Sequence, residues 1–226
     1  MLTQSAVPHT AYQPLFAVPP SPRPALSNSL APAGLVMSFA RNAEIYAEGE
    51  TSGYIYKVLS GVVRISKLLP DGRRQISAFH MPGEMFGFEA GEIHHVSAEA
   101  VVPTKVVAFK WDGLLDAGSK HVNVVRELLS FAMMGLRHTQ DHLLLLGRKN
   151  ALERLVAFLL EIDARTGSSH VIDLAMPRHD IADYLGLTLE TVSRMFAELK
   201  ERGTIKLESA RRVHLLDLAK LETMSA

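Results

Sequence analysis

The fold of this chain is decided by residues 176–217, which read MPRHDIADYLGLTLETVSRMFAELKERGTIKLESARRVHLLD. Apolar residues recur at helical spacing on both sides of Gly186, which predicts a helix over residues 178–185, a short turn and a second helix from Leu189. Thr188 precedes that second helix and can accept a hydrogen bond from a free backbone N–H group. Two short helices joined at a glycine form a helix-turn-helix, and the alternating residues that follow predict a β-hairpin, called a wing.

The second helix carries a selective set of side chains on its outer face. In a helix-turn-helix the N-terminal half of this helix enters the major groove of DNA. A carboxylate there accepts from cytosine, a guanidinium donates to guanine, and apolar or hydroxyl groups contact thymine. Because Glu190 and Arg194 lie four residues apart, a simple surface ion pair is the alternative for these two. The predicted base-reading residues are Leu189, Glu190, Ser193 and Arg194.

Basic and hydroxyl residues around this helix indicate contacts to DNA phosphates. Such contacts supply affinity and orientation without reading the sequence. The chain has 24 Lys and Arg residues against 24 Asp and Glu residues, so any basic surface must be local. The predicted backbone-contacting residues are Arg178, Thr188, Thr191, Arg202 and Arg212.

Changes in composition and periodicity divide the 226-residue chain into four parts. Residues 1–33 are rich in Pro, Ser and Ala, which predicts a flexible arm. Residues 34–116 consist of short β-branched and aromatic runs broken by glycines, which predicts a β-roll. Residues 117–146 lack proline and show a helical period, and residues 147–226 contain one more helix and the helix-turn-helix.

The segment 117–146 predicts one long helix with an apolar seam. Its apolar residues recur in alternating steps of four and three, as in a coiled coil. A helix of about 30 residues is about 45 Å long, which exceeds what a small roll can cover. We therefore predict a homodimer, with packing of the seam on the chain's own roll as the alternative. The predicted interface residues are Val125, Leu129, Ala132, Leu136 and Leu143.

The composition excludes several classes of function. The chain has no cysteine, so disulfides, thiol catalysis and cysteine-ligated iron–sulfur clusters are excluded. No run approaches the roughly 20 apolar residues of a membrane span. The N-terminus lacks the basic and apolar segments of a signal peptide. We expect a cytoplasmic protein with no membrane partner.

Two stretches resemble the CRP/FNR family of transcription regulators. They are SGVVRISKLLPDGRRQISAFHMPGEMFGF at residues 60–88 and RHDIADYLGLTLETVSRMFAELKERGTI at residues 178–205. The resemblance covers nearly everything after the arm. It implies an α+β fold with an N-terminal cyclic-nucleotide-binding-type β-roll, a long dimerisation helix and a C-terminal winged helix-turn-helix. The E-x-x-S-R pattern from Glu190 is similar to the FNR and FixK branch, whose members read double-stranded palindromes of the type TTGA–N6–TCAA.

The departures from the family pattern concern its sensory inputs. Rolls that bind cyclic nucleotides place an Arg before a Ser/Thr-Ala pair. Here Val96 precedes Ser97 and Ala98, and the neighbouring His95 is the residue that could replace the Arg. A buried phosphate without a charged partner is costly. FNR-type oxygen sensors need cysteines, which are absent. The resemblance therefore favours a FixK-like activator that needs no effector or cofactor and serves low-oxygen metabolism; a cyclic-nucleotide-dependent regulator is the alternative.

The resemblance also implies a contact with RNA polymerase. The hairpin at residues 69–75 is similar to an activating loop of the family, and its Asp-Gly turn predicts an exposed tip. An ordinary solvated turn is the alternative. The residues predicted to contact polymerase are Asp71, Arg73 and Arg74.

A metal-dependent enzyme of the cupin type is the remaining alternative. Glu92, His94 and His95 lie close together, and His80 precedes them in the roll. Metal sites need ligands that converge from defined positions, and the sequence offers no complete set. We therefore interpret these as surface histidines and predict no metal and no catalytic residue.

Overall fold

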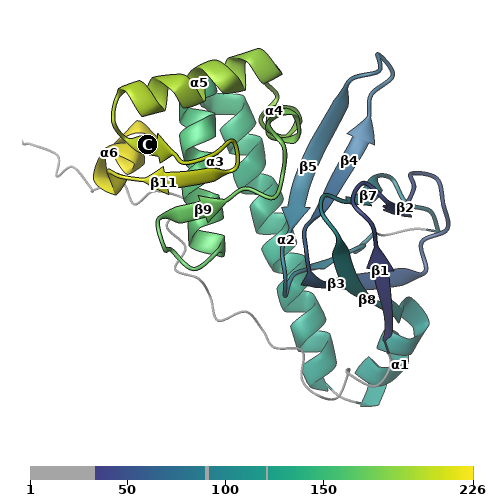
Figure 1. The fold of residues 1–226 in the computed structure, drawn as a ribbon. Helices are drawn as coiled ribbons and strands as arrows, with labels where there is room; N and C mark the ends of the chain where they lie inside the picture. The colour runs from purple at the N-terminus through teal and green to yellow at the C-terminus, as the bar shows by residue number, and fades with distance from the viewer. Residues whose placement is uncertain (1–33, 90–91, 121, 226) are drawn as a thin grey trace, which may run out of the picture.

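The computed structural model describes residues 34–89, 92–120 and 122–225, so the predicted arm at residues 1–33 lies outside the described residues. Figure 1 shows the roll beside a helical C-terminal part, with one long helix along both. The strands of the roll are β1 (Leu35–Phe39), β2 (Glu44–Tyr46), β3 (Tyr54–Ser60), β4 (Val63–Leu68), β5 (Arg74–His80), β6 (Met85–Phe86), β7 (Ser97–Ala100) and β8 (Thr104–Lys110). The later elements are α1 (Trp111–Lys120), α2 (Val122–Arg148), α3 (Ala151–Arg165), β9 (Val171–Asp173), α4 (Arg178–Leu185), α5 (Leu189–Glu201), β10 (Ile205–Leu207), β11 (Arg212–Leu215) and α6 (Leu218–Met224).

The roll consists of two four-stranded antiparallel sheets, which confirms the predicted β-roll. Their strand orders are β1-β8-β3-β6 and β2-β7-β4-β5. The hairpin predicted from Asp71 and Gly72 joins β4 to β5, and Gly72 has a φ of 83°, which glycine adopts without strain. Leu69 N donates to Arg73 O over 2.7 Å and closes the turn. This hairpin extends from the roll toward α4 (Figure 1).

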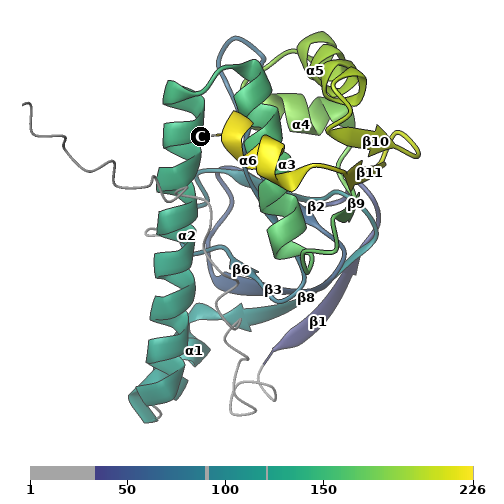
Figure 2. The ribbon, with the colours of Figure 1, turned by 90° about the vertical axis from the view of Figure 1, so that its left-hand side faces the viewer.

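The helical segment after the roll differs from the prediction at its start. The roll ends at Lys110, and α1 begins at Trp111, before the predicted residue 117. The long helix α2 is a separate element from Val122 to Arg148. The physical reason is packing, because Leu114 of α1 belongs to one buried cluster with Phe109 of β8 and two residues of α2. Figure 2 shows α2 running from α1 to the far end of the molecule.

The helix that follows α2 begins at a capping box. The Asn150 side chain accepts hydrogen bonds from the backbone N–H groups of Leu152 and Glu153 at 3.0 and 3.1 Å. The Glu153 side chain accepts from Asn150 N at 2.8 Å. These bonds satisfy groups that a helix start leaves open, so a new helix can begin at Ala151, directly after α2 ends at Arg148.

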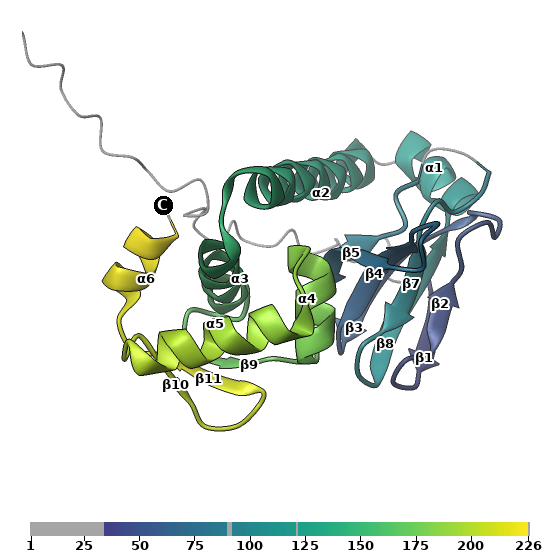
Figure 3. The ribbon, with the colours of Figure 1, turned by 90° about the horizontal axis from the view of Figure 1, so that it is seen from above.

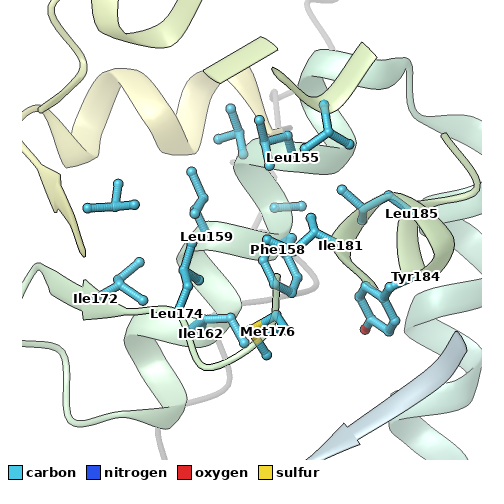
Figure 4. Close-up of a cluster of buried hydrophobic side chains, with 14 of the residues drawn as sticks. Leu155, Phe158, Leu159, Ile162, Ile172, Leu174, Met176, Ile181, Tyr184 and Leu185 are labelled. Atoms are coloured by element: carbon cyan, nitrogen blue, oxygen red, sulfur yellow. The ribbon is translucent and has the colours of Figure 1, made fainter. Parts of the chain in front are cut away.

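The largest buried cluster spans the roll and the C-terminal part. Figure 4 shows α3 at its centre, surrounded by apolar residues from β9 to α4. Ile76 and Phe79 of β5 belong to the same cluster, and the Phe79 ring lies 5.2 Å from that of Tyr184 in α4. The two parts of the chain therefore share one apolar core. No helix among the described residues has the length and apolar character needed to cross a membrane.

Candidate nucleic-acid interface

The helix-turn-helix has the local structure that its sequence predicts. Helix α4 spans Arg178–Leu185 and ends at Gly186, which has a φ of 62°. Helix α5 begins at Leu189 after Thr188, whose hydroxyl oxygen accepts a 3.1 Å hydrogen bond from Thr191 N. The inward face of α5 is buried at Val192, Phe196 and Leu199. The predicted helices, turn and cap are confirmed.

All four predicted base-reading residues are exposed on the N-terminal half of α5. Leu189 is 51% exposed, and the side chains of Arg194 and Glu190 are 67% and 78% exposed. The Ser193 hydroxyl donates to Leu189 O at 2.8 Å, which leaves its oxygen as an acceptor. Arg194 Nη2 lies 3.6 Å from Glu190 Oε1, so the surface pair is present in the free protein. A pair this exposed contributes about 0–1 kcal/mol, so DNA bases can replace it at little cost.

Four of the five predicted phosphate contacts lie at the surface of α5 and the wing. Thr188 and Thr191 stand at the N-terminus of α5, where the helix dipole and free N–H groups favour an anion. Arg202 pairs with Glu198. Arg212 Nε lies 3.4 Å from Glu208 and 3.9 Å from Asp173, and its side chain is 48% exposed.

Arg178 is placed differently from the other four. Its guanidinium carbon lies 3.1 Å from the centroid of the Phe196 ring, so the side chain stacks on α5. Its Nη1 is buried and has no hydrogen-bond partner among the described residues. Burial lowers the pKa of Arg178 to about 10. This side chain therefore ties α4 to α5 in the free protein.

The wing is a short sheet beside the end of α5. Strands β10 and β11 pair antiparallel, and β9 pairs with the other edge of β11. The turn of this predicted hairpin contains Ser209, whose hydroxyl accepts from the N–H groups of Arg211 and Arg212 at 3.2 and 2.9 Å. Figure 3 shows α5 and this wing on the side of the molecule away from α2.

The predicted dimer seam is uncovered in one copy of the chain. Val125, Leu129, Leu136 and Leu143 are between 49% and 70% exposed, and Ala132 is half-buried. The opposite face of α2 is buried against the same chain through Val124, Phe131, His142 and Leu145. The alternative, in which the seam packs on the chain's own roll, is therefore wrong.

The β4–β5 hairpin places its three predicted residues in two environments. Asp71 and Arg73 are exposed at the tip and pair over 2.6 Å. Arg74 corrects the expectation of a fully exposed set, because its side chain is only 22% exposed. Its guanidinium contacts Asp180 at 2.5 Å and Asp183 at 2.7 Å, both in α4. The reason is that β5 begins at Arg74 and lies against α4 there.

Val96 offers no charged group at the position where the family resemblance places an arginine. Val96 is half-buried and packs on the roll core. Just before it, His94 is 2% exposed, stacks on Tyr46 at 3.6 Å and lies 2.9 Å from Glu89. Burial, with the nearby Glu89 carboxylate, raises the pKa of Tyr46. Glu89 also accepts a 2.5 Å hydrogen bond from His95 N, so a phosphate beside Val96 would meet a like charge; the His95 side chain is exposed.

The histidines of the metal-enzyme alternative do not converge. The interpretation of His94 as a surface residue is wrong, because the ring is buried by its stack on Tyr46. Among the described residues, the one group with metal-ligand spacing is His179, Asp180 and Asp183. The guanidinium of Arg74 already contacts both carboxylates, so a cation is in place.

The residues that join the roll to α4 are not among those predicted from the sequence. They are Arg64 of β4, Glu99 of β7, and Asp180 and Asp183 of α4. A usable signal was present, because Arg64 interrupts an apolar strand in VVRIS. A charge in such a run needs a partner, although the sequence does not say which.

Comparisons with known proteins agree with this architecture. The cyclic nucleotide-binding domain family matches residues 36–121, and the Crp-like helix-turn-helix domain family matches residues 153–224. The chain is 46% identical over 182 residues to the nitrogen fixation regulation protein FixK of Rhizobium meliloti (strain 1021), covering 80% of this chain and 83% of that one. It is 46% identical over 211 residues to FixK of Azorhizobium caulinodans, covering 91% and 84%.

A solved structure gives the same result. The structure of FixK2 from Bradyrhizobium japonicum superposes with a TM-score of 0.82 at 45% identity, covering 86% of this chain and 98% of that chain. The similarity includes the roll, the long helix and the helix-turn-helix. This chain belongs to the CRP/FNR family of transcription regulators, and proteins named FixK are among its relatives.

Proposed function

We propose that this protein is a transcription activator that binds a palindrome of the type TTGA–N6–TCAA as a homodimer in the cytoplasm. The observation that carries the proposal is the exposure of Leu189, Glu190, Ser193 and Arg194 together on the N-terminal half of α5. The proposal includes a role in low-oxygen metabolism, which the resemblance to the FixK branch implies; two relatives are named nitrogen fixation regulation protein.

The chemistry of the exposed residues fits the half-site. TTGA contains a single G·C pair, and α5 presents a single arginine and a single acid on its outer N-terminal half. Arg194 donates to O6 and N7 of the guanine, and Glu190 accepts from N4 of a cytosine. Leu189 contacts a thymine methyl group, and Ser193 supplies a hydroxyl.

The uncovered seam of α2 supports the homodimer. Val125, Leu129, Leu136 and Leu143 form a row that water covers in a single chain. A contiguous apolar surface of this kind marks an interaction site. Pairing two copies along α2 places two α5 helices on one duplex, with half-sites about one turn, 10–10.5 bp, apart.

The side chains at and beside Val96 support activity without a cyclic nucleotide. Val96 offers no charge to a phosphate, and Glu89 adds a like charge beside that place. The absence of cysteine removes an iron–sulfur cluster as a second input. The proposal includes no catalytic step and no cofactor.

The exposed tip of the β4–β5 hairpin is the proposed contact with RNA polymerase. Asp71 and Arg73 are accessible there, whereas Arg74 contacts Asp180 and holds the base of the hairpin against α4. In a purified transcription assay, Asp71→Ala with Arg73→Ala should lower transcript yield while operator affinity stays the same. Equal yields from the variant and the parent protein would reject this contact.

Selection of bound sequences from random duplex DNA tests the proposed function. The purified protein should enrich a palindrome without added nucleotide, and cyclic AMP or cyclic GMP should change neither the sequence nor the yield. Arg194→Ala is the control and should lose enrichment at the G·C pair. Enrichment that requires a cyclic nucleotide would favour the ligand-dependent alternative, and enrichment of no sequence would reject the proposal.

A further inference from the structure

A group of charged side chains, buried at its centre and partly exposed at its edges, joins the roll to the helix-turn-helix. Asp180 of α4 is 0% exposed and accepts from Arg64 Nη1 at 2.8 Å and from Arg74 Nη2 at 2.5 Å. Arg74 Nε donates to Asp183 at 2.8 Å, and Arg64 Nε donates to Glu99 at 3.0 Å. Both arginines come from the roll, and both aspartates come from α4.

Pairs of this kind determine geometry more than they add stability. Burying two charges costs about as much as their attraction returns, so the net gain is small. A guanidinium donates in fixed directions, however, and an unpaired charge in the interior is costly. Rotation of α4 against the roll would separate Asp180 from Arg64 and Arg74, and the structure therefore resists that rotation.

A second anchor holds the other end of the same helix. Arg154 of α3 donates to Leu185 O, the last residue of α4, at 2.9 Å. The same side chain donates to Leu146 O in the last turn of α2 and to Lys149 O just after that helix, both at 2.8 Å. Helix α4 is thus fixed to the roll at its first turn and to the α2–α3 junction at its last residue.

Helix α5 follows these anchors because it packs on α4 through Ile181, Val192 and Phe196 and through the stack of Arg178 on Phe196. The angle of α5 relative to α2 is therefore set by Asp180 at one end of α4 and by Arg154 at the other. In the proposed dimer, α2 lies along the symmetry axis, so this angle fixes the separation of the two α5 helices.

We propose that Asp180, held by Arg64 and Arg74, is a positioning residue that determines which half-site spacing the dimer accepts. This inference rests on the proposed function, since it requires two half-sites. One base pair changes the separation of half-sites by about 3.4 Å and rotates them around the duplex. A rigid dimer should bind a duplex with an altered spacer weakly, whereas a dimer in which α4 can move should bind it nearly as well as the original.

The experiment measures affinity for four duplexes: a single half-site, the selected palindrome, and palindromes with the spacer shortened or lengthened by one base pair. The proteins are the parent chain, Asp180→Asn and Asp183→Asn. Lys67→Gln is the matched control, because it removes an ion pair with Glu48 that lies wholly within the roll. Thermal unfolding of each variant establishes that it is folded.

The parent protein and Lys67→Gln should lose about tenfold or more in affinity when the spacer changes. Asp180→Asn and Asp183→Asn should bind the selected palindrome about tenfold more weakly and lose less than about threefold with the altered spacers. Their affinity for the single half-site should stay within about twofold of the parent value. A residue that only supported folding would lower half-site binding equally.

Several results would overturn the inference. Spacer discrimination that is unchanged in both variants would show that Asp180 and Asp183 do not position α5. An Asp180→Asn protein that fails to fold leaves Asp183→Asn to decide, because that side chain is 23% exposed and its loss is milder. A parent protein that binds the palindrome no better than the half-site would instead reject dimeric recognition, and the positioning role with it.

Discussion

Asp180 and Glu190 are carboxylates on the neighbouring helices α4 and α5. Each is paired with arginine, but Asp180 is buried and Glu190 is exposed. Asp180 is fully buried and contacts Arg74 and Arg64 of the roll at 2.5 and 2.8 Å. The Glu190 side chain is 78% exposed and lies 3.6 Å from Arg194 in its own helix. The buried pairs cannot exchange partners without unfolding the interface, and the exposed pair exchanges freely with water.

The difference separates two tasks within one helix-turn-helix. A charge that reads DNA must leave its partner in the free protein at little cost, and the Glu190–Arg194 pair meets that condition. A charge that positions a helix must not be able to exchange its partner for water, and the buried Asp180 meets this second condition. We therefore propose that the exposed pair acts on DNA and that the buried charge positions the helix.

The largest expected effect is on stability. Asp180→Leu removes the acceptor of two arginines and should lower the free energy of unfolding by about 3–5 kcal/mol. Glu190→Leu changes an exposed pair and should lower it by about 0–1 kcal/mol. Urea unfolding followed by circular dichroism measures both values. Equal losses would remove the distinction between the two helices.

A charge on the uncovered seam of α2 provides a second test. Leu136 is 52% exposed in one chain, and the proposed dimer buries it. Leu136→Asp would place an unpaired charge in that interface at a cost of several kcal/mol, so the variant should be a folded monomer. Sedimentation velocity measures the mass, and Leu136→Met is the control that should remain dimeric. A stable dimer of Leu136→Asp would contradict the proposed interface.

Acid should lower the stability of the fold through two histidines, His142, which is buried, and His80, which is half-buried. Burial lowers the pKa of His80 and of His142 to about 4. Because the ordinary histidine pKa is about 6.5, the unfolded chain binds more protons than the folded chain between these two pH values. The contribution of these histidines to the free energy of unfolding should therefore be constant above pH 6.5 and fall progressively toward pH 4. Urea unfolding at a series of pH values measures it.

Replacing these histidines is the control for that titration. His142→Phe and His80→Phe should each flatten the fall in stability between pH 6.5 and 4. In the folded chain neither ring nitrogen of His142 has a hydrogen-bond partner among the described residues, so little is lost at neutral pH. An unchanged pH profile in both variants would mean that other groups cause the acid sensitivity.

The exposed pair on α5 should affect DNA binding and leave stability nearly unchanged. Arg194→Ala should cost about 1–3 kcal/mol on the selected palindrome and much less on scrambled DNA. Glu190→Ala should relax discrimination at the G·C pair, and the loss of a negative charge should raise affinity for scrambled DNA. Fluorescence anisotropy on the two duplexes measures both variants. The same loss on both duplexes would make Arg194 a phosphate contact.

The smallest effect is expected from the arginines at the end of α5 and in the wing. Arg202→Ala and Arg212→Ala should weaken binding to both duplexes together and reduce the salt dependence by about one unit of slope. Titrations at two salt concentrations measure the slope, and Lys67→Gln in the roll is the control. A sequence-dependent loss for Arg212→Ala would move that residue among the base-reading groups.

The sequence by itself determined the elements whose causes are local. Helix α4, the turn at Gly186 and the Thr188 cap follow from apolar period and turn chemistry within a few residues of chain. The same holds for the β4–β5 hairpin and the exposed seam of α2. The outer face of α5 could also be predicted, because a periodic helix with one apolar side must present the other side to solvent.

Only the tertiary structure decided which charged residues pair when they come from distant parts of the sequence. Arg74 and Asp180 are 106 residues apart in sequence, and no local pattern pairs them. The same applies to His94, which its sequence surroundings place at the surface and its stack on Tyr46 places inside. A periodic pattern records which face of an element is buried, but not what buries it. Long-range packing alone determines whether a charged residue meets solvent, DNA or a partner from another part of the fold.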